Sequence, residues 1–299
     1  VAEERVVELL LVAVLGEGHV LVEDVPGVGK TMLARAAARS LGCRFSRIQC
    51  TPDLLPSDVT GVSVYDERAK EFRFHPGPVM SQFVLVDEIN RATPRTQSAL
   101  LECMGEGQVT VDGVTYPMAR PFVVVATQNP IEYEGTFPLP EAQRDRFFIR
   151  MRLGYPSFEQ EVEIMRRLQK EHPIESLEAC ATPEEVVALQ RGVREVHIDA
   201  SVREYAVRLA QATRHHGDVA VGVSPRGTAA LLRAAQALAA QRGRDYVLPD
   251  DVKELAHPVL EHRLVLRPES ELRGQTTAAV IDALLEAPPL QLEEGEPIV

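Results

Sequence analysis

The feature that most constrains this chain is a glycine-rich loop at residues 24–31, with the sequence DVPGVGKT. It follows a short apolar segment, HVLVE, and precedes an alanine-rich segment that predicts a helix to about Leu41. Gly27 and Gly29 permit left-handed backbone conformations that turn successive N–H groups toward an anion. The start of the following helix adds its positive dipole. A glycine loop between a strand and a helix predicts a phosphate-binding loop of the P-loop type.

The loop assigns roles in binding a nucleoside triphosphate. Lys30 would reach the β- and γ-phosphates, and Thr31 would supply a hydroxyl ligand for Mg²⁺. The residues expected to line the phosphates are Pro26, Gly27, Val28, Gly29, Lys30, Thr31 and Met32. Asp24 stands where the usual pattern has glycine. Because a carboxylate beside a triphosphate would repel it, we expect Asp24 to point away and to serve the turn from strand to loop.

Two acids end the apolar segment at residues 83–86, which predicts a buried parallel strand. Asp87 at the end of this strand would hold Mg²⁺ through its water shell. Glu88 would polarise an attacking water, which a hydrolase needs and a small-molecule kinase does not. The two acids therefore predict hydrolysis of the triphosphate. A scaffold that only binds nucleotide is disfavoured because Lys30, Asp87 and Glu88 are all intact.

Three further polar or charged residues, Asn129, Arg146 and Arg226, are candidates for contact with the nucleotide. Asn129 ends the next predicted strand and could orient the water, although an Asn before Pro also forms turns. Arg146 precedes a fifth predicted strand and has the charge and planar geometry that suit a transferring phosphoryl group, with Arg144 as the alternative. Arg226 lies in the first turn of a predicted helix, where the helix dipole repels a cation unless an anion such as a nucleotide phosphate is near.

The chain divides into two predicted domains near residues 154–156. Strands and helices alternate before this point, which predicts a parallel α/β domain at 1–155. Ala-, Leu- and Glu-rich helical segments predict an all-α domain at 156–299, with a frayed or partner-packed tail at 288–299. Alternating segments at 62–75 and 108–118 predict two hairpins inside the first domain.

Composition narrows the possible classes of protein. The net charge of −12 argues against a protein whose main surface binds DNA, although it does not exclude a local basic pore. The four cysteines have no CxxC spacing, which predicts reduced thiols in a cytoplasmic protein and no zinc site. The longest apolar run is too short to insert into a membrane. The chain begins at Val1 inside a helical pattern, so we expect further native residues before it.

Taken together, these elements resemble an AAA+ ATPase. Three stretches resemble the MoxR subfamily more closely: residues 51–58 (TPDLLPSD), 87–92 (DEINRA) and 134–143 (EGTFPLPEAQ). The resemblance implies a P-loop AAA+ domain with a five-stranded parallel sheet and a helix-2 insert, followed by an α-helical lid. It implies ATP hydrolysis with Mg²⁺ at the subunit interfaces of a ring, commonly a hexamer. It assigns Asn129 as sensor 1, Arg146 as the arginine finger and Arg226 as sensor 2.

The resemblance also implies a cellular role. MoxR-like proteins are chaperone-like ATPases that remodel or activate a protein client, often with a von Willebrand factor A domain partner, in maturation of metalloenzymes or other complexes. A helicase-type nucleic-acid motor is the alternative, because such helicases share the two hairpins. The hairpin at 108–118 has no Lys or Arg, and the one at 62–75 is near neutral, which disfavours phosphate tracking. Gln49 could hydrogen-bond Glu88 in an idle state, or it could be an ordinary strand-end residue.

Overall fold

The computed structural model describes residues 4–129, 135–168 and 174–287. Pro130, the first residue of the 134–143 stretch and the predicted tail at 288–299 lie outside the described residues. The described chain forms two compact units. The first holds the described residues of 1–147 and 151–189, and the second holds those of 148–150 and 190–299. Each unit is described below by itself.

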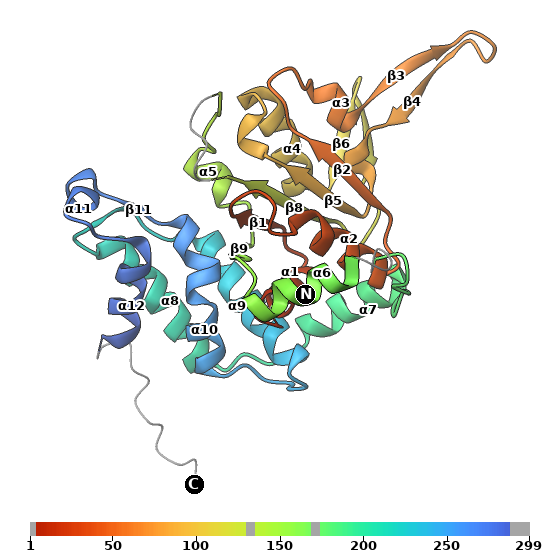
Figure 1. Cartoon of the computed structure of the whole chain (residues 1–299). Helices are drawn as coiled ribbons and strands as arrows, with labels where there is room; N and C mark the ends of the chain where they lie inside the picture. Colours follow the sequence, from red (N-terminus) through yellow and green to blue (C-terminus); the bar gives the residue numbers. More distant parts are fainter. Residues whose placement is uncertain (1–3, 130–134, 169–173, 288–299) are drawn as a thin grey trace. The chain divides into compact units, whose positions relative to one another are not determined.

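A five-stranded sheet has the order β2-β5-β8-β1-β9, and its strands β2, β5, β8 and β1 lie in the first unit (Figure 1). The strands are β1 Val20–Glu23, β2 Phe45–Gln49, β5 Phe83–Asp87, β8 Val123–Gln128 and β9 Ile149–Met151. The pairs β2–β5, β5–β8 and β8–β1 are parallel, and the predicted five-stranded parallel sheet is confirmed. Because parallel strands place their carboxyl ends at one edge, the residues that follow β1, β5 and β8 meet there.

Helices and short helical turns complete the first unit. They are α1 Glu4–Leu15, α2 Lys30–Ser40, α3 Pro56–Thr60, η1 Pro78–Met80, η2 Ile89–Arg91, α4 Pro94–Glu106, α5 Glu141–Arg144 and α6 Phe158–Leu168. Local signals explain the bounds of α4. The Thr93 hydroxyl accepts a hydrogen bond from the Thr96 N–H at its start, and Gly107 ends it in a left-handed conformation with φ 63°.

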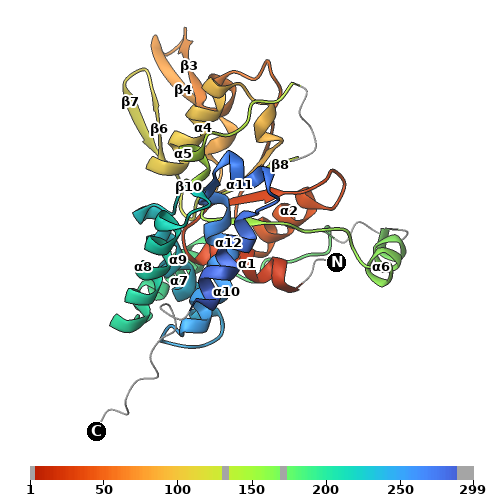
Figure 2. The ribbon, with the colours of Figure 1, turned by 90° about the vertical axis from the view of Figure 1, so that its left-hand side faces the viewer.

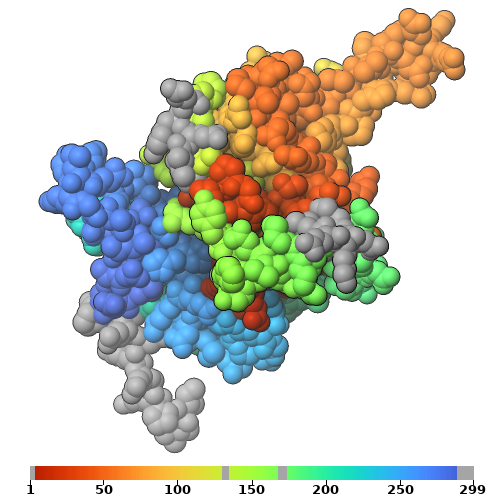
Figure 3. All heavy atoms as spheres, in the orientation of Figure 1, coloured from red at the N-terminus to blue at the C-terminus, as the bar shows by residue number. Residues whose placement is uncertain are grey.

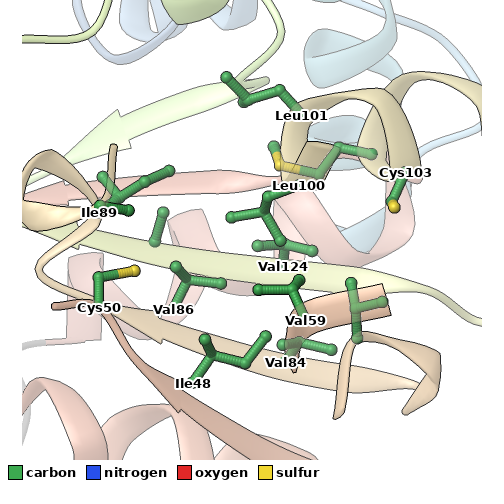
Figure 4. Packing of buried hydrophobic residues seen from close by; sticks show 14 of the residues in the cluster. Ile48, Cys50, Val59, Val84, Val86, Ile89, Leu100, Leu101, Cys103 and Val124 are labelled. Carbon is green, nitrogen blue, oxygen red and sulfur yellow. The ribbon is translucent and has the colours of Figure 1, made fainter. Parts of the chain in front are cut away.

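The core of the first unit lies between the sheet and the helices α3 and α4 (Figure 4). The strands contribute β-branched side chains that are fully buried or nearly so, among them Val84, Val86 and Val124. From α4, Leu100 and Leu101 pack against them. Strand β5 is buried along its first four residues, which explains why its sequence is continuously apolar rather than alternating. This packing fixes the edge at which Asp87 and Glu88 emerge.

Both predicted hairpins are confirmed. Strands β3 Gly61–Asp66 and β4 Glu71–Pro76 form one antiparallel ribbon, and β6 Gln108–Val111 and β7 Val114–Pro117 form the other. The β3–β4 ribbon projects from the rest of its unit (Figures 1 and 3). Where the ribbons meet, Phe74 stacks on Tyr116 with ring centroids 4.0 Å apart. This contact anchors the base of the projecting ribbon.

Residues 151–189 belong to the first unit. The Arg39 guanidinium donates to the Glu175 carbonyl at 2.8 Å, and the Cys180 N–H donates to the Ser40 carbonyl at 2.8 Å. These contacts tie the segment to α2. The boundary expected at 154–156 therefore falls inside the first unit. Helix α7, Pro183–Arg194, begins in the first unit and ends in the second.

The second unit is mainly helical (Figure 2). Its elements are α8 Ala200–His215, β10 Val219–Val221, α9 Pro225–Gln241, α10 Pro249–Leu260, η3 Glu261–Arg263, β11 Val265–Leu266, α11 Pro268–Leu272 and α12 Thr277–Glu286. The antiparallel pair β10–β11 was not predicted, because strands this short carry no alternating pattern. The helices α8, α9 and α10 pack together around buried Leu and Ala side chains.

Candidate functional site

The glycine loop has the backbone geometry that its sequence predicts. Gly27 and Gly29 adopt φ values of 86° and 92°. A Cβ added at either position would meet no atom within 4 Å, so it is the positive φ, and not crowding, that requires glycine there. The space in front of both residues is open, and α2 begins immediately afterwards at Lys30. An open glycine loop at a helix N-terminus fits the phosphates of a nucleotide.

Lys30 lies back against its own loop. Its ammonium donates a hydrogen bond to the backbone carbonyl of Asp24 at 2.8 Å. A carbonyl is a weaker partner for an ammonium than a phosphate oxygen, so a bound triphosphate would compete for this side chain. Lys30 thus lies at the junction of the loop and α2, and its role in binding the phosphates stays a prediction.

The Asp24 carboxylate points away from the loop concavity, as expected. One oxygen accepts the N–H of Val25 at 2.8 Å. The other accepts the N–H groups of Leu153 and Gly154, both at 2.7 Å. Asp24 is 9% exposed, so these three bonds satisfy a nearly buried charge. The irregular residue of the loop therefore attaches the loop to the segment that follows β9.

Asp87 and Glu88 meet at Thr127, a residue that sequence reasoning missed. The Thr127 hydroxyl donates to Asp87 Oδ1 at 2.6 Å and accepts the Glu88 N–H at 2.9 Å. Parallel pairing of Val86 with Ala126 brings Thr127 beside the acids. A sequence reading could have placed Thr127 only if the register of the two strands were already known.

Glu88 is held by two donors at the edge of the sheet. Gln49 Nε2 and Arg91 Nη1 both donate to Glu88 Oε2, at 3.0 and 2.9 Å. The hydrogen bond from Gln49 to Glu88, one of the two alternatives that the sequence left open, is present. Glu88 also adopts a left-handed backbone conformation, φ 57° and ψ 51°, which costs a non-glycine residue energy and is typical of functional sites. The role of Arg91 was not foreseen, because its only sequence signal was its place in the DEINRA stretch.

Arg47 is the second unforeseen cation. Its Nη2 donates to Asp87 Oδ2 and to Gln49 Oε1, each at 2.7 Å. Both carboxylate oxygens of Asp87 are therefore engaged, one by Thr127 and the other by Arg47. Thr31, in the first turn of α2, and Asp87 are of the ligand type that Mg²⁺ prefers. Since the Arg47 side chain is half exposed, it can leave Asp87 when a cation takes its place.

Cys50 lies under the acids and is 2% exposed. Burial, and to a lesser extent the negative charges of Asp87 and Glu88, raise the pKa of its thiol to about 12. The thiol is therefore protonated at neutral pH and inert as a nucleophile. All four cysteines of the chain are free.

Asn129 completes the group at the sheet edge. It follows β8 directly and is 6% exposed. The Asp24 N–H donates to the Gln128 carbonyl at 3.2 Å, which holds the end of β8 beside the start of the glycine loop. The structure thus brings Lys30, Thr31, Asp87, Glu88 and Asn129 to one edge of one sheet. Their individual roles stay predictions.

Arg146 is docked on α4. Its Nη1 donates to the Leu101 carbonyl at 2.6 Å. A Cβ on Gly105 would lie 2.6 Å from the same nitrogen, so any other residue there would force the end of the Arg146 side chain to shift. Arg144, the last residue of α5, has a buried Nε with no hydrogen-bond partner among the described residues. Gly105 was another residue that the sequence did not single out.

Arg226 belongs to the second unit. It is exposed in the first turn of α9, where the Ser224 hydroxyl caps the helix by accepting the Gly227 N–H at 3.1 Å. The predicted helix start is therefore confirmed. Its assignment as sensor 2 stays a prediction.

Comparisons with known proteins agree with this geometry. Residues 19–149 match the model of the ATPase family associated with various cellular activities (AAA), and residues 211–284 match the AAA lid domain. The chain is 46% identical to the chaperone MoxR1 of Mycobacterium tuberculosis, over 89% of this chain and 72% of that protein. It is 33% identical to the MoxR protein of Paracoccus denitrificans, over 95% and 90%. The chain is a MoxR-type AAA+ ATPase.

Relatives of this MoxR-type ATPase extend to solved structures. One from Cytophaga hutchinsonii is 40% identical and superposes with a TM-score of 0.89, over 95% of this chain and 89% of that one. A minichromosome-maintenance homologue from Methanopyrus kandleri gives a TM-score of 0.58 at 21% identity, which shows the fold alone. In the part of the chain that the structure describes, no helix is long and apolar enough to cross a bilayer.

Proposed function

We propose that this MoxR-type ATPase hydrolyses ATP to ADP and phosphate, and uses the cycle to remodel or activate a protein client. The position of Glu88 carries the proposal. Glu88 follows Asp87 at the carboxyl edge of the sheet, and its N–H donates to the same Thr127 hydroxyl of β8 that donates to Asp87. A phosphate-release assay on the purified chain tests the hydrolysis directly, with Lys30→Ala as the variant that should not bind nucleotide.

The side chains at the carboxyl edge of the sheet would have different roles in nucleotide binding and hydrolysis. The loop N–H groups and Lys30 would bind the phosphates, and Thr31 and Asp87 would hold Mg²⁺. The metal, when bound, neutralises charge on the phosphate oxygens. Glu88 would take a proton from the attacking water, and Asn129 would orient that water. In the arrangement seen here, Glu88 instead accepts hydrogen bonds from Gln49 and Arg91.

Gln49→Ala should therefore raise the basal rate of ATP hydrolysis several-fold. The variant lacks one of the two hydrogen-bond donors that hold the Glu88 carboxylate. The carboxylate is then freer to accept a proton from the attacking water. The dissociation constant of ATP should stay unchanged, because Gln49 is on β2 and not in the glycine loop. Steady-state phosphate release and nucleotide titration measure the two quantities, and Gln108→Ala, at an exposed Gln of β6, is the control. An unchanged or lower rate would show that Gln49 does not restrain Glu88.

The catalytic unit is proposed to be a ring, commonly a hexamer, in which Arg146 of one copy serves the site of its neighbour as an arginine finger. Its dock on α4 would fix the guanidinium for that purpose. Arg226 would act as sensor 2 and contact the nucleotide. The AAA+ family relationship supports an oligomeric assembly.

The variant Gly105→Ala tests whether the contact of Arg146 with α4 positions its guanidinium. The added methyl would displace the Arg146 guanidinium, and kcat should fall on the order of 10²-fold, the cost of a misplacement of about 1 Å. ATP affinity should not change. Alanine favours a helix over glycine by about 1 kcal/mol, so a loss of activity would not reflect unfolding. Gly192→Ala, in α7 with nothing within 4 Å of the new methyl, is the matched control. A wild-type kcat in Gly105→Ala would show that activity does not depend on this position of the Arg146 guanidinium.

The proposed client is a protein. The β3–β4 ribbon exposes Phe72 at 72% and Tyr65 at 50%, packed edge to face at 5.3 Å. Its Arg73 pairs with Asp66 and Glu71 and so offers no free charge to a phosphate backbone. The relative named chaperone MoxR1 supports the same role. The partner is proposed to be a von Willebrand factor A domain protein. A cytoplasmic location is proposed for this chain, and its free cysteines support that location.

Capture of the client tests the cellular role. A Glu88→Gln protein loaded with ATP should retain a von Willebrand factor A domain protein and a client from extracts of its source cells, and ADP should release them. Nucleic-acid capture, or single-stranded DNA that stimulates hydrolysis in a salt-sensitive manner, would favour the helicase-type alternative instead.

A further inference from the structure

Helix α6 turns its apolar side chains toward solvent. Phe158, Val162 and Met165 are spaced four and three residues apart, so they share one side of the helix. They are 78%, 52% and 53% exposed. The half-buried residues of α6 lie on the opposite side and are Gln160, Glu163 and Ile164. A surface helix normally buries its apolar stripe, and α6 shows the inverse arrangement.

The exposed stripe of α6, defined here as Phe158, Val162 and Met165, is extended by Tyr155. This residue precedes the helix and is 77% exposed. Single exposed apolar residues need no explanation, but a contiguous group marks a contact surface. None of these side chains is among the residues assigned above to the phosphates or to Mg²⁺. The exposed stripe of α6 is therefore a candidate surface for contact with another molecule.

The charges of α6 argue against a membrane as that partner. Helices that lie on a bilayer carry Lys and Arg on their polar face, attracted by anionic lipids. Glutamate outnumbers arginine on α6: the acids are Glu159, Glu161 and Glu163, and the bases are Arg166 and Arg167. Glu163 is already paired with both arginines. Glu159 and Glu161, which form no ion pair with other described residues, would be repelled from an anionic surface.

The order of these charges fits a second copy of the same helix. The exposed acids Glu159 and Glu161 occupy the first half of α6, and the exposed Arg166 and Arg167 occupy the second half. In an antiparallel pair of α6 helices, the acidic half of each helix faces the basic half of the other. In a parallel pair, acids would face acids and bases would face bases. Glu159 and Arg166 are seven residues apart and flank the stripe on the same side, so they would face each other across the pair.

We propose that α6 docks antiparallel on α6 of a second copy of this chain, with Val162 near the two-fold axis. Such a contact is isologous, whereas ring contacts are head to tail. It would therefore join two rings or two free copies, and it goes beyond the proposed function. Arg166 would exchange or share its exposed ion pair with Glu163, at little cost because ion pairs on the surface contribute little to stability.

The size of the stripe sets the expected strength. A stable dimer buries about 800 Å² on each partner, and four side chains on one short helix cover less. One α6 pair should therefore be a weak contact, seen only at high protein concentration. Several pairs acting together between two rings would bind far more tightly through multivalency.

Mass measurement over a range of concentrations tests the proposal. In sedimentation velocity, wild-type protein should show a species of twice the mass of its basic assembly, with or without ATP. Val162→Glu/Met165→Glu should weaken this doubling at least 10-fold. Both sites are on the surface, so folding is spared. Leu189→Glu, at a residue 57% exposed on α7, is the control and should leave the doubling unchanged.

Charge reversal makes the test specific for the antiparallel pair. Glu159→Arg and Arg166→Glu should each weaken the doubling, and the double variant should restore it. In a Cys180→Ser background, Val162→Cys should form an intermolecular disulfide on oxidation, and Leu189→Cys should not. A mass that never doubles, or charge variants that do not compensate, would overturn the proposal. Lost client binding at unchanged mass would assign the stripe to the client. Phosphate release is measured separately, so the proposed function can fail or hold independently.

Discussion

Glu88→Gln should lower the rate of ATP turnover on the order of 10²–10⁴-fold while ATP binding persists. The amide has nearly the same shape as the carboxylate but cannot accept the proton of the attacking water. Lys30 and the glycine loop, which would bind the phosphates, are not altered. Single-turnover phosphate release measures the chemical step, and titration with a fluorescent ATP analogue measures binding.

The control for this variant is Glu102→Gln, at an exposed acid of α4. It should hydrolyse ATP at the wild-type rate. Glu88→Gln should also keep its oligomeric mass in the presence of ATP, because the trapped nucleotide cannot be turned over. If Glu88→Gln retained wild-type activity, the assignment of Glu88 as the base would be wrong. If it lost ATP binding as well, the carboxylate would have a structural role instead.

The sheet edge shows what sequence could foresee. The glycine loop, the two acids and Asn129 each follow a strand signal, so local pattern was enough to predict them. Thr127 and Arg47 were not predicted, because their contacts depend on which strands are neighbours. The order β2-β5-β8-β1-β9 differs from chain order, and no local pattern encodes it. Partner identity at the site is therefore a property of the fold.

Asp24 and helix α6 also show that local sequence does not reveal which distant residues, or which side of a helix, form a contact. Electrostatic repulsion predicted the direction of the Asp24 carboxylate, but its partners Leu153 and Gly154 come from a distant segment. For α6, the spacing of apolar residues indicates a helix with one apolar side. It does not indicate which side faces the protein. The outward orientation of the stripe became visible only with the packed structure.

Arg146→Ala should reduce ATP turnover on the order of 10³–10⁵-fold, the range expected for an arginine supplied by a neighbouring subunit. Binding of ATP to each copy should change little, since the loop that would hold the phosphates is intact. Arg144→Ala should have a much smaller effect, because only Arg146 is docked on Leu101 and Gly105 of α4. Phosphate release at saturating ATP compares the two variants, and sedimentation confirms that their assemblies are unchanged.

Mixing the two inactive proteins tests whether the site is shared. In a mixed ring, an Arg146→Ala copy contributes an intact Glu88, and a neighbouring Glu88→Gln copy contributes an intact Arg146. Some interfaces then carry both groups, so activity should return in part and depend on the mixing ratio. Arg146 acting within its own chain predicts no recovery at any ratio, because each copy would still lack one group. Full activity in a monomeric form of the wild type would contradict the shared site for the same reason: an isolated copy has no neighbour to supply the arginine.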